Sequence, residues 1–311
     1  MKKSVLVTLA DKNYINQAKQ LFSSVYFNSG WQGDYLLLSH DIPEKDLKWF
    51  RKKGIIVKKV KPLIYKKFNQ WGPSIYSKFY LFSPYFKKWK NVVYLDSDII
   101  VKYSIENLAN LKGFYATTYK DKKLYHEIFK FNRELDKLKG KYSDLKGLVF
   151  NSGVMAFSSD IIKENTFIDL KNIFHKYVYI TDGEEPLLNL YFQGIWNRLP
   201  IIYNFPVVLS NKVVEAIFGE SVVQHFVSSK KPWKKDSSFY REWKDNLEKA
   251  DRIDLDNRIK GNLLSTRKKL NYSIFLRFLV IYCIIDKKIG QIGIILRNYS
   301  PKIYYILKRI K

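Results

Sequence analysis

Residues 91–101 read NVVYLDSDIIV, an apolar run that carries two carboxylates, Asp96 and Asp98. The branched and aromatic residues predict a strand, and alternate strand residues share a face, so the two carboxylates are expected to project together with Ser97 opposed. Two like charges side by side repel each other unless a metal ion, a Lys or Arg side chain, or ample water lies between them. The pair therefore indicates either a cation site or a solvated turn after a buried strand.

Strand-like and helix-like runs alternate on both sides of this stretch. The expected strands cover 4–10, 34–40, 55–60, 91–101, 113–119, 148–157 and 222–227, and the expected helices cover 16–27, 44–54, 74–86, 122–140, 160–178 and 183–193. This alternation predicts an α/β fold with a mostly parallel sheet and helices on both faces. Ligands bind at the carboxyl ends of the strands in such sheets, which favours a functional role for the acidic pair.

Length, charge and cysteine content narrow the classes of protein to consider. With 311 residues and 46% hydrophobic content, the chain can build one large domain or two small ones, and its net charge of +26 favours an anionic partner. The single Cys283 excludes an internal disulfide framework and a Cys-based zinc site. Asp11 and Lys12 interrupt the first apolar run before a signal-peptide core forms, so we expect a cytoplasmic protein.

The C-terminal part differs in composition, and we expect two regions: 1–240 as the main domain and 241–311 as a basic, aromatic-rich helical tail. Residues 261–311 hold eleven Lys and Arg against one acid, Asp286. Their apolar clusters fall short of the roughly 20 residues that span a bilayer, so the tail is expected to lie on an anionic membrane surface. A basic helical pair packed on the main domain is the alternative. Nucleic-acid binding is not expected, because no recognised module accompanies the tail.

Two further stretches carry groups that suit a metal and a phosphate. His225 lies near the end of the expected strand 222–227, and an imidazole beside two carboxylates forms a mixed site suited to Mn²⁺ or a similar ion. Lys231 lies six residues later and could face a diphosphate. A structural histidine and a solvated loop are the alternatives.

Two stretches carry groups that suit a sugar. Asn151, Ser152 and Gly153 lie within an apolar strand, where polar groups need partners, although a β-bulge would also explain them. Glu184 and Glu185 precede a helix with Pro186 in its first turn, an arrangement that helix capping alone would explain. A carboxylate facing an anomeric carbon could also act as a nucleophile or stabilise an oxocarbenium-like transition state.

Taken together, seven short stretches in this order resemble glycosyltransferase family 8. They are ADKNY (10–14), YSKFYLF (76–82), YLDSDIIV (94–101), FNSGVM (150–155), GEEPLLN (183–189), YNF (203–205) and HFVSSKKPW (225–233), so the resemblance spans about residues 4–235. It implies a GT-A fold, a UDP-sugar donor, Mn²⁺ or Mg²⁺ dependence and retention of the anomeric configuration.

The resemblance also implies roles for individual positions. It assigns the metal to Asp96, Asp98 and His225. It assigns the nucleotide sugar to Ala10, Asp11, Asn13, Tyr14, Lys78, Ser97, Asn151, Ser152 and Lys231. Glu184 and Glu185 fall at the catalytic position, where many members read Asp-Gln-Asp, and Ser228 replaces the usual Gly after the metal-binding His.

We therefore expect a retaining, Mn²⁺-dependent enzyme that transfers glucose or galactose from a UDP-hexose to a saccharide or glycolipid acceptor of a bacterial cell envelope, at the inner face of the membrane. A non-catalytic relative that binds a membrane or another polyanion is the alternative. A sugar-1-phosphate nucleotidyltransferase is disfavoured, because no Gly-rich phosphate loop follows the first strand.

Overall fold

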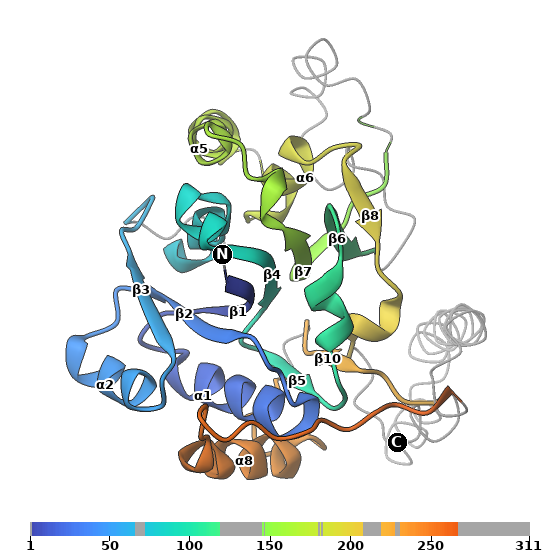
Figure 1. The fold of residues 1–311 in the computed structure, drawn as a ribbon. Coiled ribbons are helices and arrows are strands. Elements are labelled where there is room, and N and C mark those ends of the chain that lie inside the picture. Colours follow the sequence, from blue (N-terminus) through green and yellow to red (C-terminus); the bar gives the residue numbers. More distant parts are fainter. Residues whose placement is uncertain are drawn as a thin grey trace, which may run out of the picture.

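The computed structural model describes residues 2–65, 72–118, 145, 147–179, 181, 183–207, 219–227 and 231–266. Its main feature is a seven-stranded sheet in the order β3-β2-β1-β4-β7-β6-β8 (Figure 1). The strands are β1 Lys2–Ala10, β2 Asp34–His40, β3 Ile56–Val60, β4 Trp89–Leu95, β6 Phe114–Thr117, β7 Asn151–Ser158 and β8 Trp196–Arg198. Within the described ranges, β7 alone runs antiparallel to its neighbours, so the predicted, mostly parallel sheet is confirmed.

Helices cover both faces of this sheet, as predicted. One face packs against α1 Ile15–Ser24, the π-helical turn η1 Val25–Ser29, α2 Glu44–Lys52 and α8 Tyr240–Lys249. The other packs against the 3₁₀ segments η2 Pro73–Phe82 and η3 Pro84–Lys88 and against α5 Thr166–Tyr177 and α6 Glu185–Tyr191. Along β1, Leu6 faces the first side and Val5 and Val7 face the second, as the alternation of side chains along a strand requires.

The expected single strand over 91–101 is wrong, because the chain changes sheets in its middle. β4 ends at Leu95, and β5 Ile99–Val101 belongs to a second sheet of order β5-β10-β9, with β9 Phe205–Pro206 and β10 Val223–His225. β5 pairs antiparallel with β10, so residues 96–98 form the connection between the two sheets. The acidic pair therefore lies at the junction of the sheets rather than along one strand.

The single helix expected over 74–86 is also wrong. Ser83 has an extended backbone with ψ 155° between η2 and η3, and Pro84 follows it. Proline disfavours a helical conformation in the residue before it and has no N–H to donate. Smaller differences affect two other elements, since β7 begins at Asn151 rather than 148 and α5 begins at Thr166 after the 3₁₀ turn η6 Ser159–Ile161.

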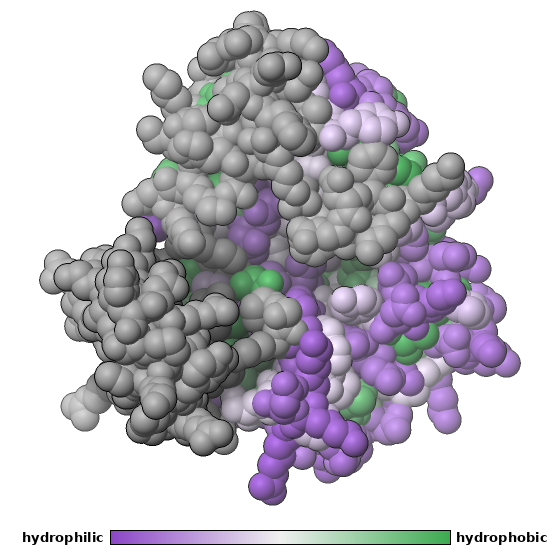
Figure 2. All heavy atoms as spheres, turned by 180° about the vertical axis from the view of Figure 1, so that it is seen from behind, coloured by the Kyte–Doolittle hydropathy of each residue, from purple (hydrophilic) through white to green (hydrophobic). Residues whose placement is uncertain are grey.

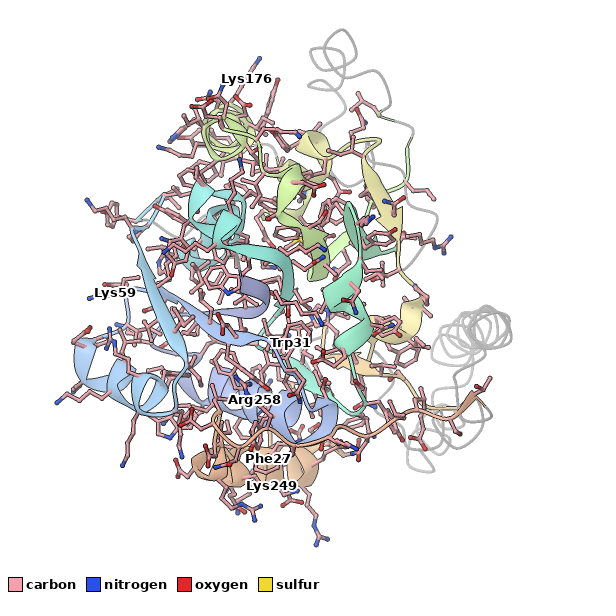
Figure 3. All side chains as sticks on the ribbon, in the orientation of Figure 1. Phe27, Trp31, Lys59, Lys176, Lys249 and Arg258 are labelled. Carbon is pink, nitrogen blue, oxygen red and sulfur yellow. The ribbon has the colours of Figure 1, made fainter. Side chains whose placement is uncertain are left out.

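The described part of the C-terminal region packs on the main body. After α8 and the 3₁₀ turn η8 Ala250–Arg252, an extended run crosses beneath α1 (Figure 1). Its Asn262 donates a backbone hydrogen bond to Asn28 and accepts one from Ser104, both 2.8 Å long. Arg258 from the same run donates to the carbonyl of Trp31 and lies close to it in Figure 3.

Two sequence expectations lie outside the described residues: the helix over 122–140 and the tail from residue 267 onward. No helix in the described ranges is long and apolar enough to cross a membrane. The face shown in Figure 2 is mostly hydrophilic where it is described, with its hydrophobic atoms in small separate areas. Two further 3₁₀ turns complete the description, η4 Glu106–Asn110 and η7 Ile201–Tyr203.

Candidate functional site

Three predicted metal ligands meet where the two sheets join. One carboxylate oxygen each from Asp96 and Asp98 and a ring nitrogen of His225 lie within 4.8 Å of one another. His225 Nε2 is 3.2 Å from Asp98 Oδ1 and 3.8 Å from Asp96 Oδ2. The structure thus brings the three side chains together from the β4–β5 connection and the end of β10.

Close backbone packing makes this meeting possible. A Cβ atom on Gly153 of β7 would lie 2.2 Å from His225 Cε1, so any larger residue at position 153 would displace the imidazole. Asp96 N also donates to Gly153 O at 2.8 Å. The register between β6 and β7 shifts at this point, since Ala116 pairs with Met155 and Thr117 with Asn151. The strand irregularity considered for the sequence is therefore present, and Gly153 also allows the close approach of His225.

Two lysines neutralise the paired carboxylates. Lys78 Nζ lies 2.9 Å from Asp96 Oδ1, and Lys231 Nζ lies 2.6 Å from Asp98 Oδ2. Burial opposes the charge on Asp98, but His225 and Lys231 outweigh it and hold the pKa of Asp98 well below its usual value. Asp98 is therefore held as a carboxylate, the form that binds a cation.

Lys78 also binds the second acidic group of the site. Its Nζ lies 2.6 Å from Glu184 Oε1 and 3.2 Å from Ser152 Oγ. Burial disfavours the ammonium, yet Asp96 and Glu184 together raise the pKa of Lys78 above its usual value. Lys78 is buried, so it acts as a fixed positive charge between the acidic groups of two elements.

The two glutamates at the start of α6 face β7 rather than their own helix end. The N-cap residue of α6, Glu184, makes no capping hydrogen bond with its side chain. Glu185 Oε2 accepts hydrogen bonds from Asn151 Nδ2 at 2.8 Å and from Ser152 N at 2.9 Å. Pro186 and Glu185 occupy the first turn as expected for a helix N-terminus, and both glutamates also have partners outside the helix.

Four of the residues expected to hold the nucleotide sugar lie at the carboxyl end of β1 and just after it: Ala10, Asp11, Asn13 and Tyr14. Ala10 ends that strand, and Asp11 accepts hydrogen bonds from Asn13 N at 2.8 Å and Ser74 Oγ at 2.9 Å. The Tyr14 ring meets the Trp233 ring edge to face, with centroids 6.0 Å apart. Burial, followed by the nearby charge of Asp98, raises the pKa of Tyr14.

The remaining expected contact, Ser97, is buried between the two aspartates. The predicted site residues come from the ends of β1, β4 and β10 and the loops that follow them, from the start of β7 and of α6, and from the middle of η2. They converge on one region, as expected for the carboxyl edge of a parallel sheet.

Sequence reasoning missed two side chains that orient the ligands. Tyr94 donates from its hydroxyl to Asp96 Oδ1 at 2.6 Å, and burial raises its pKa far above the usual value, so the phenol keeps its proton. The signal was available, because Tyr94 precedes Asp96 by two residues in an expected strand. Asn204 Oδ1 lies 2.9 Å from His225 Nδ1. It belongs to the YNF stretch, but nothing in the sequence links that stretch to residue 225.

The donor set fits a divalent cation. Carboxylate oxygens with one imidazole nitrogen suit Mn²⁺ and related ions. Asn204 holds Nδ1 of His225, which is the usual way to direct Nε2 of a histidine toward a metal.

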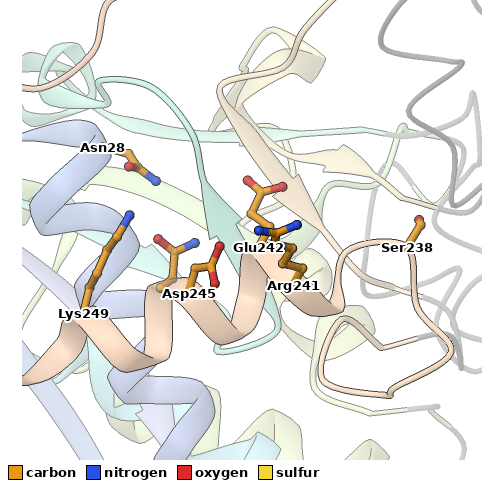
Figure 4. A pocket seen from close by; sticks show the side chains of 7 residues that line it. Asn28, Ser238, Arg241, Glu242, Asp245 and Lys249 are labelled. Atoms are coloured by element: carbon orange, nitrogen blue, oxygen red, sulfur yellow. The ribbon is translucent and has the colours of Figure 1, made fainter.

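A cavity of about 430 Å³ lies elsewhere, along α8 (Figure 4). Its lining residues are Asn28, Ser238, Arg241, Glu242, Asp245, Asn246 and Lys249. None of them belongs to the cluster of Asp96, Asp98 and His225, so this cavity and the candidate metal site are separate features of the molecule.

Comparisons with known proteins identify related chains. The family model described as Glycosyl transferase family 8 matches residues 5–237. Galactinol synthase 5 of Arabidopsis thaliana is 25% identical over 217 residues, which cover 64% of this chain and 63% of the relative. Glycosyltransferase GlyB of Streptococcus pneumoniae serotype 4 is 25% identical over 220 residues, which cover 65% of this chain and 48% of the relative. The chain thus spans less than two thirds of these relatives.

Solved structures share the architecture. The galactosyltransferase LgtC, in complex with donor and acceptor sugar analogues, matches with a TM-score of 0.60 at 17% identity over 78% of this chain and 95% of that one. Glycosyltransferase GlyE of Streptococcus pneumoniae matches with a TM-score of 0.57 at 21% identity over 82% of this chain and 63% of that one. At these identities the matches show the fold.

Proposed function

The chain belongs to glycosyltransferase family 8, and from that premise we propose that it transfers a hexose from a UDP-sugar to a saccharide or glycolipid acceptor with retention of the anomeric configuration. The observation that carries the proposal is the cluster of Asp96, Asp98 and His225, with Lys231 and Lys78 beside it. A site that holds a cation and two ammonium groups suits a diphosphate.

Asp96, Asp98 and His225 are the residues that would hold Mn²⁺ or Mg²⁺. A divalent cation bound there would supply Lewis-acid stabilisation of the negative charge that develops on the departing UDP. Tyr94 and Asn204 orient two of these ligands through hydrogen bonds of 2.6 and 2.9 Å. The protein thus prepares the ligand geometry before the donor arrives.

Lys231 is placed to exchange its present partner in the protein for the diphosphate of the donor. In the structure its ammonium binds Asp98 Oδ2 and the Phe226 carbonyl. A cation held by Asp98 would replace this ammonium as the partner of the carboxylate, and Lys231 could then donate to a phosphate oxygen. We propose that Lys231 then neutralises charge on the leaving diphosphate.

Glu184 and Glu185 are the acids proposed to face the donor sugar. Glu184 is 6% exposed, and its Oε1 lies 2.6 Å from Lys78 Nζ. Glu185 is held by donors from Asn151 and Ser152. A carboxylate at this position can stabilise positive charge at the anomeric carbon, as an ion pair or through a short-lived covalent bond.

The donor is proposed to be UDP-glucose or UDP-galactose, since a galactosyltransferase shares the fold. The acceptor is proposed to be a saccharide or glycolipid of a bacterial cell envelope, which bacterial relatives make reasonable. The basic C-terminal region would hold the enzyme on the anionic inner face of the membrane.

The proposal is tested by measuring UDP release from a panel of UDP-sugars, with and without Mn²⁺. We expect Mn²⁺-stimulated release from a UDP-hexose, and loss of at least about 100-fold of this rate in Asp98→Asn, which removes a ligand charge. Asp245→Asn is the control. It removes the same charge at an exposed position of α8, away from the cluster, and should retain the rate.

Two outcomes would contradict the proposal. Absence of release from every UDP-sugar, in protein that binds Mn²⁺, would favour a non-catalytic relative that binds a membrane or another polyanion. Full Mn²⁺-dependent turnover in Asp98→Asn would remove the metal role of the cluster. The anomeric configuration of the product, read from its proton coupling constant, tests retention separately.

A further inference from the structure

Two side-chain amides connect His225 to Glu185. His225 Nδ1 lies 2.9 Å from Asn204 Oδ1, and Asn204 Nδ2 lies 2.9 Å from Asn151 Oδ1. Asn151 Nδ2 in turn donates to Glu185 Oε2 at 2.8 Å. The connection runs from a candidate metal ligand on β10 to an acid at the start of α6, across β7.

A backbone group fixes the direction of every hydrogen bond in this chain. Gly153 N–H can only donate, and it lies 3.0 Å from Asn151 Oδ1, so that atom is an acceptor. Asn151 must then present its NH₂ group to Glu185, and Asn204 must present its NH₂ group to Asn151. The remaining atom of the Asn204 amide, Oδ1, is an acceptor and requires a proton on Nδ1 of His225.

The protonated Nδ1 leaves Nε2 as the nitrogen that can bind a cation beside Asp96 and Asp98. Asn204 is fully buried and His225 is 4% exposed, so bulk water cannot readily replace a lost partner. A buried amide without its partners is costly, which makes the whole arrangement depend on the identity of residue 204.

We infer that Asn204 is a positioning residue that sets the tautomer of His225 and, through Asn151, the orientation of Glu185. The inference rests on the proposed function for its catalytic consequence, but its metal-binding consequence does not. One residue thereby couples the metal end of the site to the sugar end. Asn204 is neither a proposed metal ligand nor a proposed catalytic acid, and it acts through His225 and Asn151.

Asn204→Ala removes the acceptor from His225 and the donor from Asn151. Mn²⁺ should bind about 10- to 100-fold more weakly, the usual effect of losing the partner of a metal-bound histidine. Turnover should also fall, because Asn151 loses one of the hydrogen bonds that orient it toward Glu185.

Asn204→Asp distinguishes the effect of residue 204 on His225 from its effect on Asn151 and Glu185. Its carboxylate still accepts from His225 Nδ1, so Mn²⁺ should bind at least as tightly as in the wild type. It cannot donate to Asn151 Oδ1, and repulsion between the two facing oxygens would displace the Asn151 amide from the position in which it donates to Glu185. We therefore expect kcat to fall with little change in the KM for the donor, while the metal affinity is retained.

The experiment measures the Mn²⁺ dissociation constant by titration calorimetry without donor, and kcat and KM by UDP release, for the wild type and both variants. Asn107→Ala serves as the matched control, because exposed Asn107 bonds only the neighbouring Tyr203 hydroxyl among the interactions described. It should match the wild type in both measurements. Thermal unfolding of each variant shows whether the fold persists, and if Asn204→Ala fails to fold, the Asp variant still carries the test.

Wild-type Mn²⁺ affinity in a folded Asn204→Ala would overturn the inference. Loss of Mn²⁺ binding in Asn204→Asp would overturn it as well, because that variant keeps the acceptor for His225. Unchanged turnover in Asn204→Asp would show that Asn151 does not depend on residue 204. If no UDP-sugar is turned over by the wild type, the proposed function fails, while the Mn²⁺ titrations still decide the role of Asn204.

Discussion

Lys78 shows how one buried side chain can hold a polar site together. Its ammonium lies between Asp96 of the β4–β5 connection and Glu184 at the start of α6, at 2.9 and 2.6 Å. Removing a single partner from a buried charge cluster leaves the other charges uncompensated. Stability and site geometry therefore depend on the same residue.

Lys78→Met should lower the free energy of unfolding by about 3 kcal/mol, because it leaves the buried Glu184 and the partly buried Asp96 without their cation. Urea denaturation at neutral pH measures the change. Exposed Lys90 on β4 has no ion pair among the described interactions, and Lys90→Met should change stability by less than about 0.5 kcal/mol. Equal stability of the Lys78 variant and the wild type would contradict this account.

Glu185→Gln tests whether charge or hydrogen bonding matters at the sugar end of the site. A glutamine oxygen can still accept from Asn151 and Ser152, so the local geometry and Mn²⁺ binding should be retained. Loss of the negative charge should lower kcat by about 100- to 1,000-fold, the range seen when transition-state charge stabilisation is removed. Steady-state UDP release and Mn²⁺ titration measure the two effects, and wild-type turnover would show that the charge is not needed.

At this scale the sequence predicts residue types better than their partners. Asp96, Asp98 and His225 were predicted as one metal site, and the structure brings them within 4.8 Å. That they bind a metal stays a prediction. Asn204 was not predicted to orient His225, because the contact depends on how β9 and β10 pair in space. A contact between residues 21 apart in the chain leaves no local pattern to read.

At the scale of elements, the close approach of β7 to β10 determines where His225 can lie. Gly153→Ala should displace the imidazole, because the added Cβ would lie 2.2 Å from Cε1 and 2.7 Å from Nδ1 of His225. We expect weaker Mn²⁺ binding by at least about tenfold, measured by calorimetry. Gly72→Ala is the control, since among the described residues its Cβ would approach only Ser74 Oγ, at 3.8 Å. Wild-type metal affinity in Gly153→Ala would show that the strands separate without cost.

α2 was predicted well, because residues at both of its ends mark where the helix begins and stops. α2 begins after Pro43 with Glu44 and Asp46 in its first turn, has Arg51 and Lys52 in its last turn, and is followed by Gly54 with φ 73°. These charges complement the helix dipole, and the left-handed glycine ends the helix.

The β4–β5 connection was mispredicted because its sequence remains apolar and branched on both sides of the acidic pair. β4 and β5 are buried alike, so hydrophobicity does not change where the chain changes sheets. Pairing with β7 before the turn and with β10 after it determines the break. Such pairing involves distant residues and is not encoded in a local period.

At the scale of the molecule, the extended run after α8 belongs to the packed body. Ile253 is 3% exposed, and Tyr26 donates from its hydroxyl to the Asn257 carbonyl at 2.5 Å. A Cβ on Gly261 would clash with the Ser29 backbone, so this run lies directly against η1. The membrane-attachment region expected from residue 241 thus includes residues that cover the core, and the division at residue 240 stays a prediction.

Truncation after residue 266 should therefore leave the melting temperature within a few degrees of that of the full chain. Truncation after residue 252 removes Ile253 and the hydrogen bonds of Asn257 and Asn262. Burial of the Ile253 side chain alone contributes about 2 kcal/mol. We expect its melting temperature to fall by about 8 °C or more. Equal melting of the two truncated forms would show that the run does not contribute to stability.

The truncation after residue 266 also isolates the proposed membrane contact. Eleven Lys and Arg lie between residues 261 and 311 with one acid, and a basic segment gains about 1 kcal/mol per charge near an anionic surface. Full-length protein should sediment with vesicles of 30% phosphatidylserine at 0.1 M salt, and the 1–266 form should bind at least about tenfold more weakly. Both should fail to bind neutral phosphatidylcholine vesicles, and raising the salt to 0.5 M should release the full chain, because screening shortens the range of the attraction. Equal binding of the two forms would assign the contact to the folded body, whereas salt-resistant binding would indicate apolar insertion in place of charge.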